Sequence, residues 1–204
     1  MIGRNAVILF AGDSITDAGR NRELAQPSER VALGNGFACL LAAQLLDEHV
    51  EKHLKIYNRG IGGNTIRKMA ERWQADCLDL APDLLSILIG VNDTDCPTPE
   101  FDACYRRLLD QARSLNPELH LVLCEPFRVV VQDEQHRWID GLRERREIAR
   151  NIAADYEACW VPFQAAFDDM IEQAPAASWI PDGVHPSLGG HHRMAGRWLE
   201  AVDL

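Results

Sequence analysis

The chain has 204 residues, of which 47% are hydrophobic, and its 31 acidic against 21 basic side chains give a formal net charge of −10. This length and apolar content suit one globular domain, residues 1–204, with a sizeable core. The acidic balance argues against nucleic acid or an anionic membrane surface as the main partner. No stretch reaches the roughly 18 apolar residues of a membrane span, and the apolar run after residue 5 is too short for a signal peptide.

Short apolar runs alternate along the chain with longer segments in which apolar residues recur at helical spacing. The predicted strands span residues 6–11, 54–57, 84–89, 119–124 and 158–161. The predicted helices span residues 37–50, 66–80, 101–115, 138–156 and 188–202. Alternating strands and helices are typical of a parallel sheet with helices on both faces. The sequence therefore predicts an α/β fold, a three-layer α/β/α sandwich of flavodoxin-like kind with a five-stranded parallel sheet.

The six cysteines are spread along the chain without any Cys-x-x-Cys pair. Cysteines placed singly on apolar faces are typical of reduced core thiols in a cytoplasmic protein, which is the location we expect. A run of charge lies at residues 143–147, where three arginines are mixed with two glutamates. On a helix such a run is typically a solvent-exposed face with internal charge pairs, so we expect no nucleic-acid site there.

A sharp turn follows the first predicted strand. Gly12 permits that turn and leaves the Ser14 hydroxyl at the carboxyl end of the strand, which is the edge where open α/β sheets bind ligands. A serine placed there is a candidate nucleophile, and equally it is an ordinary helix N-cap. The choice between the two depends on whether the chain also supplies a base and an oxyanion hole.

An aspartate and a histidine lie three residues apart near the other terminus. Pro181 and Pro186 bracket Asp182 and His185, so the segment is expected to be a turn. In such a turn the Asp182 carboxylate can accept a hydrogen bond from Nδ1–H of His185, which aims Nε2 outward as a base for a serine. The alternative is a turn capped by Asp182 next to an ordinary surface histidine.

Hydrogen-bond donors follow two further predicted strands. Residues 58–65 contain three glycines before a predicted helix, and Asn92 follows the strand at 84–89. Because the carboxyl ends of parallel strands share one edge of a sheet, these segments can meet Ser14 in space. The N–H groups of Ser14 and Gly63, with the Asn92 side-chain amide, can then stabilise the oxyanion of an acyl transfer.

Four blocks of this sequence resemble the SGNH hydrolase family, also called the GDSL esterase/lipase family. The blocks are residues 12–15, Gly63 within 58–65, residues 90–93 and residues 182–186. The resemblance implies a serine esterase in which Ser14 is the nucleophile and Asp182 orients His185. It also implies that Gly63 and Asn92 complete the oxyanion hole and that neither a metal nor a cofactor is needed.

Residues 12–20, 59–67 with Arg72 and Trp73, and 86–90 are similar to the acetylxylan-esterase branch of that family. This similarity implies a small acyl ester as substrate, above all an acetylated xylo-oligosaccharide, and some members of the branch form homo-oligomers. The chain departs from the branch at residues 94–97, where relatives often carry a Trp-Arg pair. As substrate contacts the sequence offers Asp13, Phe127 and Trp179, with core packing as the alternative for Trp179.

Three other functions compete with a short-chain acetylesterase. A thioesterase or lysophospholipase of the same fold would act on longer acyl chains, but the sequence shows no long apolar lid. A metal site could be built from Asp182, His185, His191 and His192, because histidine is a common metal ligand. A non-catalytic flavodoxin-type module, binding a flavin or a partner, would leave the serine, asparagine and Asp-His pattern unexplained.

Overall fold

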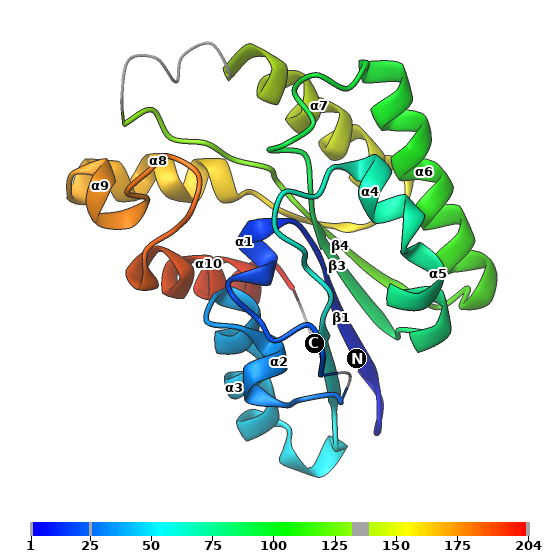
Figure 1. The fold of residues 1–204 in the computed structure, drawn as a ribbon. Helices are drawn as coiled ribbons and strands as arrows, with labels where there is room; N and C mark the ends of the chain where they lie inside the picture. The colour runs from blue at the N-terminus through cyan, green and yellow to red at the C-terminus, as the bar shows by residue number, and fades with distance from the viewer. Residues whose placement is uncertain (1, 25, 132–138, 203–204) are drawn as a thin grey trace.

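The structure is a computed structural model that describes residues 2–24, 26–131 and 139–202. At its centre is a five-stranded sheet with the order β2-β1-β3-β4-β5, and every neighbouring pair is parallel (Figure 1). The strands are β1 (Val7–Gly12), β2 (Lys55–Asn58), β3 (Leu84–Leu88), β4 (His120–Cys124) and β5 (Cys159–Val161). The predicted five-stranded parallel sheet is confirmed, and each strand lies within one residue of its predicted bounds.

Helices cover both faces of the sheet and make the predicted three layers (Figure 1). On one face lie α3 (Phe37–Glu48), α8 (Phe163–Gln173) and α10 (Leu188–Ala201). On the other lie α4 (Ile66–Glu71), α5 (Trp73–Asp76), α6 (Thr98–Leu115) and α7 (Ile139–Asp155). Successive side chains of a strand point to opposite faces, so Ile8 and Phe10 of β1 join the first core while Leu9 and Ala11 join the second.

The helices differ most from the prediction in two places, and the predicted start of a helix at residue 138 lies outside the described residues. The helix expected over 66–80 is divided into α4, α5 and a 3-10 turn, η2 (Leu78–Leu80), because the backbone leaves helical geometry at Arg72. The 11-residue helix α8 was not predicted, although the buried Phe163, Phe167 and Met170 recur at helical spacing. The remaining short elements are α1 (Ser14–Asp17), α2 (Arg30–Leu33), η1 (Val50–Lys52) and α9 (Ala176–Trp179).

The strand order places the topological switch point of the sheet at the ends of β1 and β3. The chain runs from β1 to β2 on one side and then crosses to β3 on the other, and such a switch point is where parallel sheets bind ligands. Ser14 follows β1 and Asn92 follows β3, so both lie at this switch point. Gly12 lets the ends of β1 and β3 approach each other, because a Cβ atom at residue 12 would lie only 2.3 Å from the carbonyl oxygen of Leu88.

Within the described ranges, no helix combines the length and apolar character needed to cross a bilayer. All six cysteines belong to the described part of the chain and all are free, four of them buried, as the sequence predicts. The cytoplasmic location stays a prediction.

Candidate active site

The Ser14 hydroxyl meets the His185 ring across 171 residues of sequence. Ser14 Oγ lies 2.8 Å from Nε2 of His185. The N-cap of α1 is Asp13, whose Oδ1 accepts a hydrogen bond from the Ile15 N–H at 3.0 Å. The alternative of Ser14 as an N-cap therefore does not apply, because Asp13 fills that role and leaves the Ser14 hydroxyl to the histidine.

Asp182 holds the opposite side of the same ring. Its Oδ2 lies 2.7 Å from Nδ1 of His185, and its Oδ1 accepts from the N–H groups of Val184 and His185 at 2.9 and 2.7 Å. Partial burial favours the neutral acid, but the hydrogen bonds from His185 and Val184 together outweigh it and hold the pKa of Asp182 below its ordinary value. Because a carboxylate only accepts, Nδ1 carries the hydrogen and Nε2 is free to accept one from Ser14.

Trp179 supports the turn that carries His185. Its carbonyl oxygen accepts from the Ser187 N–H at 2.8 Å, and it packs so closely on α10 that a Cβ atom at Gly190 would lie 2.3 Å from that oxygen. The Arg193 guanidinium lies 5.6 Å from the centre of the half-buried Trp179 ring. These contacts fit the packing interpretation of Trp179, and its contact with substrate stays a prediction.

The two predicted oxyanion donors lie on exposed loops beside Ser14. Gly63 has a φ of +73°, a backbone conformation that favours glycine, and Asn92 is exposed. The Asn92 amide donates one hydrogen bond from Nδ2 to the carbonyl oxygen of Asn64 at 3.0 Å. Since an amide nitrogen carries two hydrogens, one remains for a second acceptor. The loop that carries Gly63 contacts the turn of Ser14 at Gly62, where an added Cβ atom would lie 3.8 Å from the Cβ atom of Ser14.

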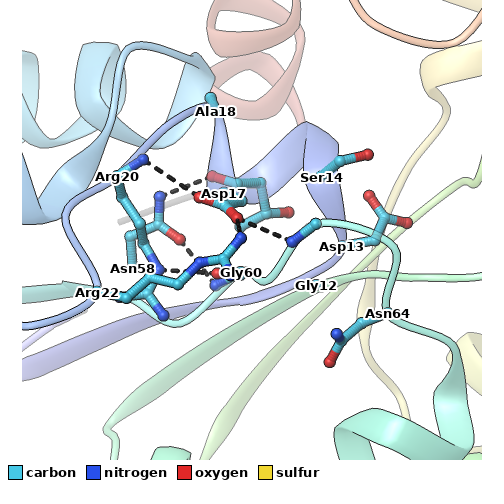
Figure 2. Close-up of polar contacts among 12 residues, drawn as sticks. Gly12, Asp13, Ser14, Asp17, Ala18, Arg20, Arg22, Asn58, Gly60 and Asn64 are labelled. Atoms are coloured by element: carbon cyan, nitrogen blue, oxygen red, sulfur yellow. Dashed lines mark hydrogen bonds and ion pairs between the residues drawn. The ribbon is translucent and has the colours of Figure 1, made fainter.

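A buried aspartate locks this loop against α1 (Figure 2). Asp17 Oδ2 accepts from the Gly62 N–H at 2.8 Å and pairs with Arg22, and Asp17 Oδ1 accepts from the Arg20 N–H. Arg20 then donates from Nε to the carbonyl oxygen of Gly60 at 2.7 Å. Figure 2 shows the Ser14 side chain pointing away from this network, toward the side where Asp13 and Asn64 lie. The network therefore fixes the loop without occupying the reactive hydroxyl.

Two of the predicted substrate contacts are not supported by the structure. Asp13 is only 1% exposed and lies beneath Ser14 as the cap of α1. Phe127 is fully buried and stacks on Phe167 with ring centres 4.4 Å apart. Both sequence positions follow strands at the correct edge of the sheet, but their side chains turn inward, so neither presents a surface to a substrate.

Burial of Asp13 makes the stability of the protein sensitive to pH. Burial raises the pKa of Asp13 from 3.8 to about 7, against the Ile15 hydrogen bond that lowers it, and the nearby Asp93 raises it further. The folded state thus retains a proton that the unfolded state loses, and the free energy of unfolding falls as pH rises from about 4 to about 7. The stabilisation of the folded state by the proton on Asp13 is fully present below about pH 4 and lost above about pH 7.

Asp13→Asn should remove this contribution. Relative to wild type, we expect the variant to gain free energy of unfolding on the order of 4 kcal/mol between pH 4 and pH 8, because asparagine does not titrate there. Urea denaturation of both proteins across this range measures the difference. A difference that is the same at every pH would show that Asp13 does not hold the proton in the folded state.

Residues 143–147 were expected to form a solvent-exposed face, and Arg145 is the exception because it is buried. It is 2% exposed and donates to the carbonyl oxygen of Asp93 at 3.1 Å and to that of Cys96. Its guanidinium also lies 5.7 Å from the centre of the Phe101 ring. Arg145 thereby fixes the loop that follows Asn92, a role that the alternating charges around it gave no reason to expect.

The alternative metal site is not assembled in the part of the chain that the structure describes. His191 is buried, and its Nδ1 accepts a hydrogen bond from the Phe37 N–H at 3.2 Å. Burial lowers the pKa of His191 to about 4, which keeps the ring neutral as this bond requires. Within the described ranges, no three His, Cys, Asp or Glu side chains are grouped so that they could hold a metal ion.

Known proteins are similar to this chain over nearly its whole length. The model of the GDSL-like Lipase/Acylhydrolase family matches residues 10–193. An acetylxylan esterase from Geobacillus stearothermophilus is 32% identical over 98% of this chain and 95% of its own length. A solved structure of an acetylxylan esterase from the same organism is 31% identical to this chain, with a TM-score of 0.88. The match covers 100% of this chain and 96% of the esterase.

A second solved structure is similar over nearly the whole chain. It is a GDSL-like lipase from Parabacteroides merdae, which is 39% identical and covers 98% of this chain and 97% of its own, with a TM-score of 0.94. These similarities support a carboxylic ester hydrolase with the fold described above. The chain belongs to the GDSL-like lipase/acylhydrolase family, the SGNH hydrolases.

Proposed function

We propose that this protein is a serine esterase that removes short acyl groups, above all acetyl groups, from a carbohydrate. The observation that carries the proposal is the hydrogen-bonded triad Ser14–His185–Asp182. Its contacts of 2.8 and 2.7 Å lie at a topological switch point. This triad supplies a nucleophile, a base and an orienting carboxylate, which are the three groups that acyl transfer through a serine needs.

The reaction would run in two steps through an acyl-enzyme. Ser14 Oγ attacks the ester carbonyl carbon while its proton passes to Nε2 of His185. The N–H groups of Ser14 and Gly63 and the Asn92 amide stabilise the oxyanion, and its collapse releases the alcohol, which takes the proton from His185. Water then attacks the acyl group with His185 as base, releasing the acid and restoring the Ser14 hydroxyl.

The relatives support both the site and the substrate class. Variants of the acetylxylan esterase from Geobacillus stearothermophilus at a serine, an aspartate and a histidine are named catalytic mutants. Its aspartate and histidine are three residues apart, as Asp182 and His185 are here. The surroundings of Ser14 also suit a small polar substrate, because the exposed Arg22 and Asn92 lie on the neighbouring loops.

Acyl-chain preference separates this function from its alternative, a thioesterase or lysophospholipase of the same fold. We expect kcat/KM to fall from p-nitrophenyl acetate to the butyrate and by at least about tenfold to the octanoate, because each added methylene needs apolar surface. Steady-state kinetics on the three esters, followed by a screen of acetylated xylo-oligosaccharides, measures this. A clear preference for the octanoate would favour the alternative.

A further inference from the structure

One arginine outside the candidate triad donates hydrogen bonds to three residues in two segments around the site. Arg72 lies between α4 and α5, and its side chain is 17% exposed. It donates from Nε to Oδ1 of Asn64 at 2.8 Å, from Nη1 to the carbonyl oxygen of Arg59 at 2.8 Å, and from Nη2 to that of Gly12 at 3.2 Å. An ion pair with Asp76, one helical turn later, holds the guanidinium in place.

These partners connect Arg72 to the Asn92 amide. The side chain of Asn64 is held by Arg72, and the backbone carbonyl of the same residue accepts the hydrogen bond from Asn92 Nδ2 at 3.0 Å. Asn64 is 7% exposed, so water has little access to compete for these bonds. Gly12, at the end of β1, comes two residues before Ser14. A single guanidinium therefore ties the nucleophile turn to the residue that fixes the Asn92 amide.

We propose that Arg72 is a positioning residue for the oxyanion hole. It holds Asn64 so that the Asn92 amide keeps one rotamer, with one Nδ2 hydrogen bound to Asn64 and the other directed at the substrate oxyanion. Oxyanion donors act because they are fixed before charge develops, and a displacement of about 1 Å lowers the rate by about 10²-fold. The inference rests on the proposed function, because it requires an acyl-transfer oxyanion at this site.

Arg72→Lys is the variant that tests the role with least disturbance. Lysine keeps the charge opposite Asp76, but a single ammonium cannot replace the planar guanidinium that reaches three acceptors in two segments. We expect kcat for p-nitrophenyl acetate to fall about tenfold or more with KM nearly unchanged, since the loss affects only the transition state. Arg59→Lys is the matched control, because the Arg59 guanidinium lies in the same ion cluster, 3.8 Å from Asp76, and stacks on Tyr57. It should keep the wild-type kcat.

A double-mutant cycle with Asn92→Ala distinguishes positioning from general destabilisation. Asn92→Ala alone should lower kcat by about 10²–10³-fold, as expected for one lost donor. If Arg72 acts through Asn92, then Arg72→Lys costs little further activity in that background. If the two losses multiply, or if Arg72→Lys costs no more than Arg59→Lys, the inference is wrong.

The same assay separates this inference from the proposed function. An inactive wild type on p-nitrophenyl acetate and the longer esters would refute the proposed function, and the inference would fall with it. An active wild type that loses activity with Asn92→Ala, but not with Arg72→Lys, would refute the inference alone.

Discussion

Ser14→Ala is expected to lower kcat for p-nitrophenyl acetate by at least about 10⁴-fold and to leave the melting temperature unchanged. The variant removes the only atom that forms the bond to the acyl group, yet it keeps the residue 14 N–H of the oxyanion hole. It also keeps the cap of α1, because that hydrogen bond is made by Asp13. The lost contact is with an exposed histidine, so little folding free energy depends on it. Initial rates and thermal denaturation measure the two effects.

Ser114→Ala is the control for that experiment. Ser114 is an exposed serine of α6 whose hydroxyl donates to the carbonyl oxygen of Asp110 within the same helix. Its removal should change neither the rate nor the melting temperature measurably. Ser14→Ala with more than about one per cent of the wild-type rate would mean that a different group attacks the ester.

Asp182→Asn is expected to lower kcat by about 10⁴-fold through the tautomer of His185. Asparagine has nearly the same shape, and its carbonyl oxygen can still accept from the Val184 and His185 N–H groups. Its amide, however, offers hydrogens to Nδ1 in place of a lone pair. Nδ1 then accepts, Nε2 carries the hydrogen, and the ring cannot take a proton from Ser14. Steady-state kinetics from pH 6 to pH 9 measures the loss.

Asp169→Asn is a suitable comparison for this variant, because Asp169 is an exposed aspartate on a different element, α8. It should retain full activity. If Asp182→Asn stayed within about tenfold of wild type, His185 would not depend on the carboxylate for its tautomer, and the proposed role of Asp182 would be wrong.

The sheet and the triad were predictable because each depends on local patterns. A short apolar run such as residues 84–88, between longer segments of helical spacing, is typical of a buried strand, and the ends of parallel strands share one edge. That rule alone brings Ser14 and Asn92 to the same edge of the sheet. The pairing of Asp182 with His185 needed only a turn bracketed by prolines, and the structure places it there.

The supporting residues were not predictable, because their roles depend on where long side chains reach in three dimensions. Arg72 and Arg145 look like ordinary charges of helical segments, yet Arg72 joins the end of β1 to the loop after β2 and Arg145 is 2% exposed. Phe127 was predicted at the site because it follows β4, but sequence position does not reveal that its ring turns into the core. The direction of a side chain after a strand ends depends on the packing of its neighbours.

Covalent trapping identifies the residue that attacks the ester. The protein is treated with a serine-directed phosphonate ester, and intact mass and peptide mapping follow. We expect one adduct for each chain, on the peptide that contains residue 14, with a parallel loss of esterase activity, and no adduct on Ser14→Ala. An adduct on another residue, or an unlabelled protein that still hydrolyses acetate esters, would contradict the role of Ser14 as nucleophile.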